Sequence, residues 1–171
     1  MKICIVNPGR CGSTLLLGYL HNRLPGYSLI YEVIQPRLPD IKNVIFKYQY
    51  LHCFQPLHGA DKYIIIDRKD KEAWLYSTYM SKKHNHFHGA LKQEFDFNAE
   101  EYNNAKENLN MLYDNMWVPE RERLLSKGAD MVWYEDIKIN EDVSINLPLL
   151  GNTKLEPVWS TTNQLPNEYI Y

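Results

Sequence analysis

The sequence has few cysteines, no long apolar run and no excess of one charge. Its three cysteines, Cys4, Cys11 and Cys53, lack Cys-x-x-Cys spacing, so neither a disulfide framework nor a cysteine metal site is expected. The 19 basic and 21 acidic residues give a net charge of −2, which provides no overall attraction for nucleic acid or an anionic membrane. No stretch reaches the roughly 20 apolar residues of a membrane-spanning helix, and residues 3–6 are too short for a signal peptide. These absences favour a soluble, cytoplasmic protein in which any anion site is local.

The apolar pattern predicts one α/β domain over residues 1–171. With 44% apolar and 13% aromatic residues, the chain can bury one substantial core. The isoleucines at 64–66 are typical of a parallel strand buried on both faces, whereas apolar spacings of three and four after residue 97 indicate a helix that Pro119 kinks or restarts. We expect strands near 3–6, 28–33, 43–48, 63–67 and 130–134, helices near 15–24, 71–82 and within 97–127, and mostly loop beyond. This alternation predicts a three-layer α/β/α fold with a mainly parallel central sheet.

A candidate phosphate-binding loop, residues 8–14, lies between the first predicted strand and helix. Free N–H groups and the helix dipole favour an anion there, and the two glycines let the backbone approach it closely. Arg10 adds a charged donor, and the loop's serine and threonine add hydroxyl donors or a helix cap. The residue after Gly12 is Ser13, so the lysine of a Walker A loop is missing, which disfavours ordinary ATP or GTP hydrolysis. A glycine turn before a capped helix is the simpler alternative.

The segment Arg10-Cys11-Gly12-Ser13-Thr14 resembles the 5′-phosphosulfate loop of sulfotransferases that use 3′-phosphoadenosine 5′-phosphosulfate. The resemblance implies a P-loop-like fold, in the manner of P-loop NTPases, and a donor site that needs no metal. It assigns binding of the 5′-phosphosulfate to Arg10, Cys11, Gly12, Ser13 and Thr14.

Two further motifs follow in the order that the family has. Arg68 after the isoleucine strand and Ser77 in the next helix are similar to the pair that holds the 3′-phosphate of the donor. The family's usual interval is eight residues; Arg68 to Ser77 is nine and Lys69 to Ser77 is eight, so Lys69 stays open as a substitute. A solvated charge cluster at a helix start is the alternative. Residues 132–137, Val-Trp-Tyr-Glu-Asp-Ile, resemble the end of the family's last core strand.

The resemblance implies transfer of the sulfuryl group to a hydroxyl or amine, in line and with charge growing on the leaving phosphate. Arg10 and the loop N–H groups would stabilise that charge. Glu32 is the first candidate for the general base, with a plain ion-paired glutamate as the alternative and His52 as a second base. Lys47 resembles a lysine that the family keeps near the reacting oxygens, and would bind the sulfuryl group.

The acceptor is not identified by the sequence. A small molecule or a carbohydrate is expected, with no nucleic acid and no membrane insertion, and a homodimer that completes the acceptor site is left open. The competing classes are a nucleotide-binding module without catalysis and a P-loop kinase-like phosphotransferase, the latter disfavoured by the missing lysine.

Two weaker signals are discounted. Cys4 and Arg10 have the spacing of a tyrosine phosphatase loop, but Cys4 falls inside the first predicted strand, where a buried thiol is inert. His84, His86 and His88 alternate as metal ligands can, but no carboxylate or cysteine partners are evident nearby; an acceptor-binding loop is the favoured role, and no metal is expected.

Overall fold

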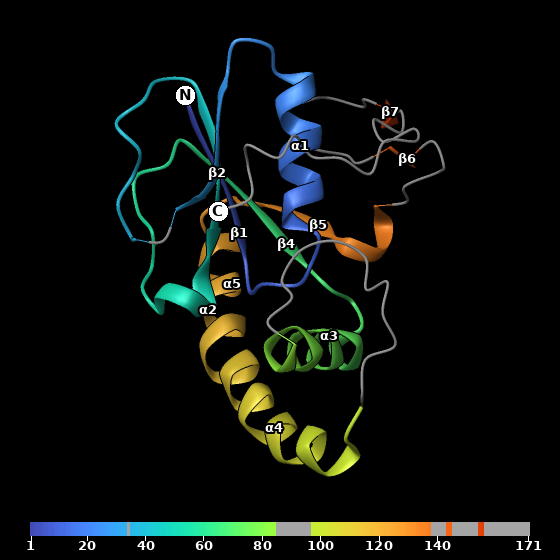
Figure 1. Cartoon of the computed structure of the whole chain (residues 1–171). Coiled ribbons are helices and arrows are strands. Elements are labelled where there is room, and N and C mark those ends of the chain that lie inside the picture. The colour runs from blue at the N-terminus through green and yellow to red at the C-terminus, as the bar shows by residue number, and fades with distance from the viewer. Residues whose placement is uncertain (34, 85–96, 138–142, 145–153, 156–171) are drawn as a thin grey trace.

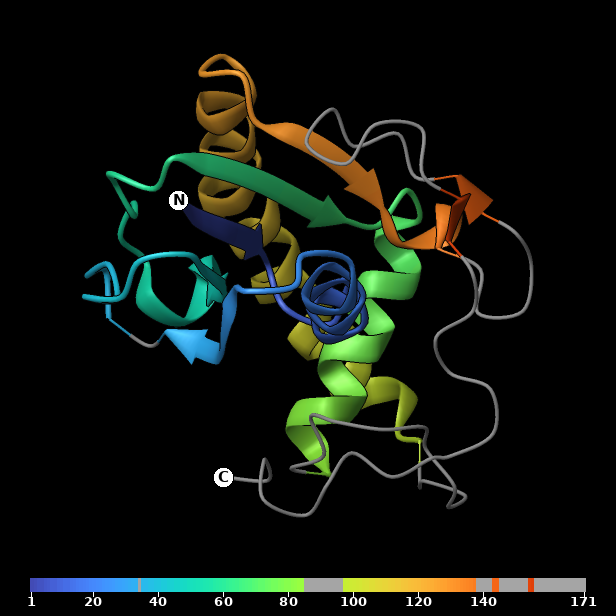
Figure 2. The ribbon, with the colours of Figure 1, turned by 90° about the horizontal axis from the view of Figure 1, so that it is seen from above.

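A five-stranded parallel sheet forms the centre of the molecule. The structure is a computed structural model that describes residues 1–33, 35–84, 97–137, 143–144 and 154–155. The strands lie in the order β2-β3-β1-β4-β5, and every neighbouring pair is parallel. Their bounds are β1 Lys2–Asn7, β2 Ser28–Val33, β3 Val44–Gln49, β4 Lys62–Asp67 and β5 Asp130–Trp133. The predicted α/β class with a parallel sheet is confirmed (Figures 1 and 2).

Helices follow β1, β3 and β4 and flank the sheet. Their bounds are α1 Ser13–Arg23, α2 Tyr50–Cys53, α3 Lys71–Lys83, α4 Ala99–Leu112, a π-helical turn Tyr113–Trp117, α5 Val118–Leu125 and a 3₁₀ turn Tyr134–Asp136. Two short antiparallel strands, β6 Val143–Ser144 and β7 Lys154–Leu155, follow. The predicted helices are confirmed within two residues at α1 and α3, where Asp70 caps α3 by accepting a hydrogen bond from the Ala73 N–H at 3.0 Å. Of the helices that the structure describes, none combines the length and apolar character needed to cross a membrane.

The sheet separates two apolar layers, as its alternating side chains require. Ile3, Ile5 and Ile45 point to the face covered by α1, where they pack with Leu16, Leu17 and Leu20. Cys4, Phe46 and Ile65 point to the opposite face, where side chains of α3, α4 and α5 cover them. The second layer contains Trp74, Leu75, Leu109, Tyr113, Trp117 and Leu124. The result is the three-layer arrangement that the sequence predicted.

Pro119 coincides with a restart of the helix, as expected: α5 begins at Val118, and Pro119 lies in its first turn. Proline has no N–H and crowds the preceding turn, so a regular α-helix across this position would lose a hydrogen bond and clash. The wider π turn Tyr113–Trp117 stands immediately before α5. The segment 99–125 therefore runs on as consecutive helical elements. A correction concerns β5, which ends at Trp133, so that Tyr134 belongs to the following turn.

The strand order determines where loops can form a site. The chain leaves β1 toward β2 on one side, and leaves β4 toward β5 on the other. In open parallel sheets, a ligand crevice lies outside the carboxyl ends of two neighbouring strands whose connections diverge in this way. Residues 8–12 follow β1 and residues 68–70 follow β4, so the first two motifs meet at this position.

The burial of β4 generates a stability prediction. Ile65 is fully buried, whereas Ile41 is 43% exposed. We expect Ile65→Ala to lower the free energy of unfolding by about 3 kcal/mol, because it removes packed atoms and leaves a cavity. Ile41→Ala, the same chemical change at the surface, should alter it by no more than about 0.5 kcal/mol. Urea unfolding measures both, and equal losses would contradict the assigned core.

Candidate anion-binding site

The loop after β1 is anchored at both its N–H and its carbonyl groups. The buried side chain of Asn7 accepts a hydrogen bond from the Gly9 N–H at 2.9 Å and donates to the Tyr48 carbonyl at 3.1 Å. The Trp74 indole N–H, from α3, donates to the Gly9 carbonyl at 2.8 Å. The N–H and the carbonyl of Gly9 are therefore both bonded inside the protein, and β3 and α3 help to set the conformation of the loop.

Arg10 occupies a strained backbone conformation in this loop. Its φ of 53° lies in the left-handed region, which costs a residue other than glycine about 1 kcal/mol or more. The Arg68 side chain donates from Nε to the Arg10 carbonyl at 2.9 Å. No peptide bond in the described chain is cis, so the N–H groups of Arg10 and Cys11 point opposite to the two anchored carbonyls. Strain held in place by neighbours is typical of ligand-binding loops.

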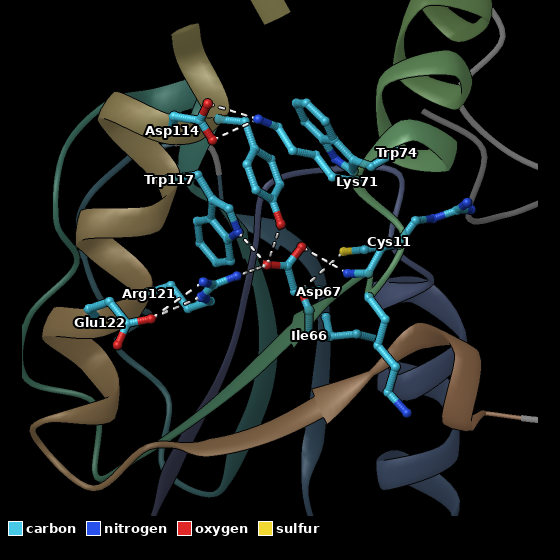
Figure 3. A network of polar contacts seen from close by, with 12 residues as sticks. Cys11, Ile66, Asp67, Lys71, Trp74, Asp114, Trp117, Arg121 and Glu122 are labelled. Atoms are coloured by element: carbon cyan, nitrogen blue, oxygen red, sulfur yellow. Dashed lines mark hydrogen bonds and ion pairs between the residues drawn. The ribbon is translucent and has the colours of Figure 1, made fainter. Parts of the chain in front are cut away.

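Two side chains fix the middle of the loop. The fully buried Cys11 thiol donates to the Ile66 carbonyl at 3.2 Å (Figure 3), and burial raises the pKa of this thiol. Gly12 has φ 76°, and a Cβ at this position would lie 2.5 Å from the Tyr134 ring. Cys11 therefore anchors the loop to β4, and only glycine fits beneath Tyr134. Gly12 has no side chain to cap α1, so the first turn of α1 keeps its N–H groups for other acceptors.

The two arginines of the predicted motifs lie side by side. Burial, and then the positive charge of Arg68, lower the pKa of Arg10. Arg10 donates from Nε to the Ser77 hydroxyl at 3.2 Å, and the Arg68 guanidinium lies 4.4 Å from the centre of the Tyr134 ring. Two positive charges held close together repel each other, and an anion bound between them would offset that repulsion.

Lys69 points to a different part of the surface. Its N–H donates to Glu135 at 2.9 Å, and its ammonium forms an ion pair with Asp136. The Arg68 side chain, by contrast, donates to the Arg10 carbonyl and lies over the Tyr134 ring. The geometry thus favours Arg68 over Lys69 as the basic residue that faces the loop.

A second polar cluster lies beside the start of α1. The Lys47 ammonium, almost fully buried, is 3.4 Å from Glu32 Oε2 and 3.4 Å from the Thr14 hydroxyl. It also lies 4.5 Å from the centre of the Tyr31 ring, whose hydroxyl is 3.2 Å from that of Thr14. β2, β3 and α1 therefore bring together a carboxylate, an ammonium group and two hydroxyls.

His52 approaches this cluster from α2. Its Nδ1 lies 3.9 Å from Glu32 Oε1, an oxygen that is buried and has no hydrogen-bond partner in the described structure. The His52 side chain is 63% exposed. Both base candidates named from the sequence thus lie next to each other, and Glu32 is the one that forms an ion pair with Lys47.

The structure brings the predicted residues together at one edge, with one change of partner. The resemblance pairs Arg68 with Ser77, but it is Arg10 that bonds Ser77, and Arg68 that bonds the Arg10 backbone. Sequence reasoning missed Trp74, Tyr31 and Tyr134. Trp74 lies between Arg68 and Ser77, and Tyr134 lies in the third motif, but only the fold identifies their partners.

The discounted signals have separate outcomes. Cys4 is fully buried in β1, and burial raises the pKa of its thiol, so it does not suit a nucleophile. His84 ends α3, whereas His86 and His88 lie outside the described residues. Within the ranges that the structure covers, no three histidine, cysteine or carboxylate side chains gather as metal ligands do.

The fold and site define a parallel α/β protein with a candidate anion site at the carboxyl ends of β1 and β4. Comparison with protein-family models, with curated proteins and with solved structures found no match for this chain. Any function must therefore be argued from the residues and their geometry.

The fit of Gly12 beneath Tyr134 generates a prediction. Gly12→Ala adds a positive-φ cost of about 1 kcal/mol and a clash with the Tyr134 ring, whereas Gly128→Ala, at φ 82°, adds the first cost alone because nothing lies within 4 Å of its Cβ. We expect Gly12→Ala to lower the free energy of unfolding by at least about 1 kcal/mol more than Gly128→Ala. Equal losses in thermal or urea unfolding would show that Tyr134 does not restrict the loop.

Proposed function

We propose that this protein is a sulfotransferase with a P-loop-like fold, which moves the sulfuryl group from 3′-phosphoadenosine 5′-phosphosulfate to a hydroxyl or amine acceptor. The observation that carries the proposal is the meeting of Arg10, Arg68 and Ser77 where the connections of β1 and β4 diverge. This is a place where parallel sheets bind nucleotides, and it joins the two motifs that resemble the family's donor site.

The loop suits the 5′ end of the donor. Its carbonyls at Gly9 and Arg10 accept hydrogen bonds from Trp74 and Arg68, which leaves the opposite N–H groups and the start of α1 for phosphate oxygens. Arg10 adds a charge there, and Ser13 and Thr14 add hydroxyls. Arg68 and Ser77 lie on the α3 side of Arg10, where they would receive the 3′-phosphate.

The proposed chemistry uses the loop with Arg10 and the polar cluster around Lys47. The donor supplies the sulfuryl group, whose bond to the phosphate oxygen breaks as a bond to the acceptor oxygen or nitrogen forms. Arg10 and the loop N–H groups stabilise the negative charge that grows on the phosphate oxygen. Lys47 stabilises the sulfuryl oxygens, and Glu32 accepts the proton that the acceptor loses. Thr14 contacts both Lys47 and Tyr31, so it links the loop to the proton-accepting cluster.

Donor-product binding tests the anion site. We expect 3′-phosphoadenosine 5′-phosphate to bind the wild-type protein, and Arg10→Ala and Arg68→Ala each to weaken binding at least about tenfold, because each removes charge-assisted hydrogen bonds. Isothermal titration calorimetry measures these affinities. Arg23→Ala is the matched control: Arg23 ends α1, about 15 Å from the loop, and its loss should leave the affinity unchanged. A wild-type protein that does not bind this nucleotide would overturn the proposed function.

Glu32 is tested by turnover of the donor with water as acceptor. We expect Glu32→Gln to lower the rate at which the protein converts the donor to 3′-phosphoadenosine 5′-phosphate and sulfate by about a hundredfold, because the amide cannot accept the proton. Nucleotide affinity should be unchanged. Release of labelled sulfate measures the rate, and Glu107→Gln, an exposed change on α4, is the control. An undiminished rate in Glu32→Gln would remove Glu32 as the base.

A further inference from the structure

Asp67, the last residue of β4, is the centre of a buried network. It is not among the residues that the resemblance assigns to the donor site. Its side chain is fully buried and accepts four hydrogen bonds (Figure 3). Oδ2 accepts from the Tyr113 hydroxyl at 2.9 Å, the Trp117 indole at 2.7 Å and the Arg121 guanidinium at 2.8 Å. Oδ1 accepts from the backbone N–H of the next residue, Arg68, at 2.8 Å. The carboxylate thus connects the π turn and α5 directly to the arginine of the site.

The negative charge of Asp67 is balanced by an arginine that lies outside the candidate site. A buried carboxylate requires a positive partner, and Arg121 supplies it from α5, on the face of the sheet opposite α1. Arg68, the next residue along the chain, is also an arginine, but no ion pair joins it to Asp67 in the described structure. Because Arg121 and two further donors satisfy Oδ2, the Arg68 side chain extends to the Arg10 carbonyl and over Tyr134 instead.

The donors come from a helical segment with an unusual turn. Tyr113 and Trp117 are the first and last residues of the π turn, and Arg121 follows four residues later. Single π turns inside α-helices occur frequently at functional sites. The ring of Tyr113 also lies 4.8 Å from that of Trp74, whose indole holds Gly9. The same segment therefore supports both halves of the candidate site.

We propose that Asp67, charge-balanced by Arg121, is a positioning residue that sets the backbone of Arg68 so that its guanidinium faces the 3′-phosphate of the donor. This inference rests on the proposed function and adds to it a requirement that the sulfotransferase resemblance does not contain. Asp67 does not contact the donor. It acts through the N–H of Arg68, which donates to Oδ1, and its Oδ2 is held by three donors from the other side of the sheet.

The substitution Asp67→Asn separates these contacts. The amide oxygen can still accept from Tyr113, Trp117 and Arg121, but the amide NH₂ then faces the Arg68 N–H, donor against donor. The packing volume is unchanged. The variant thus loses the hydrogen bond from the Arg68 N–H, and it also removes the negative charge that Arg121 balances, while the three hydrogen bonds to Oδ2 can remain.

The experiment compares two nucleotides by calorimetric titration. The affinity for 3′-phosphoadenosine 5′-phosphate divided by that for adenosine 5′-phosphate reports what the 3′-phosphate contributes. We expect Asp67→Asn to lower this ratio about tenfold, with the affinity for the 5′-monophosphate within about twofold of the wild type. In Asp67→Asn combined with Arg68→Ala, the ratio should fall no further than in Arg68→Ala alone, because both changes act on the same contact.

Two more variants keep the test decisive. Tyr113→Phe removes one donor from Oδ2 and keeps the ring; it should lower the ratio about threefold, and it decides the question if Asp67→Asn does not fold. Glu120→Gln is the matched control, because Glu120 is another buried carboxylate bonded to an arginine of α5, Arg123, at 2.6 and 2.7 Å. Its ratio should equal that of the wild type.

The outcomes separate this inference from the proposed function. If Asp67→Asn, or in its place Tyr113→Phe, weakens both nucleotides equally or leaves the ratio unchanged, Asp67 has a structural role only, and the donor site stands without it. If the wild-type protein binds neither nucleotide, the proposed function is wrong and the positioning role is wrong with it.

Discussion

The candidate site depends on one constraint: other elements hold the Gly9 and Arg10 carbonyls, so the N–H groups of Arg10 and Cys11 point the opposite way. A short loop that follows a buried strand has few partners of its own, so neighbouring elements have to supply them. Trp74 of α3 supplies one and Arg68 after β4 supplies another, while Cys11 fastens the loop to the Ile66 carbonyl. The parallel pairing of β1 with β4 makes these bonds possible, because it puts both carboxyl ends at one edge.

The second requirement is electrostatic, and the chain meets it by distributing acids and bases across the sheet. Asp67 lies next to Arg68 in sequence but is paired with Arg121 on the opposite face, and Lys69 is paired with Asp136. Arg68 is thereby directed to the same edge as Arg10. A chain with a net charge of −2 can in this way build a local positive site, as the proposed binding of an anionic nucleotide requires.

The sequence predicted the strands and the principal helices well. A short run of β-branched isoleucines favours a strand, and apolar residues spaced by three and four favour a helix. It also located the residues of the edge, since glycines after a strand are a local signal. It did not predict which side chains meet. Ser77 bonds Arg10 rather than Arg68, and Trp74 reaches a carbonyl 65 residues away along the chain. Such contacts depend on how α3 packs on the sheet, and a local pattern does not contain that information. The sequence did not predict the π turn before Pro119 either. Two residues of this turn, Tyr113 and Trp117, donate to Asp67 on β4, and this long-range contact is not visible in a local pattern.

The most direct test of the account is a crystal structure of the protein with 3′-phosphoadenosine 5′-phosphate. We expect the 5′-phosphate within hydrogen-bonding distance of the N–H groups of residues 10–14, and the 3′-phosphate on Arg68 and Ser77, with the Asp67 carboxylate still bonded to Arg121. A nucleotide bound away from the carboxyl ends of β1 and β4, or one whose phosphates contact neither Arg10 nor Arg68, would contradict it.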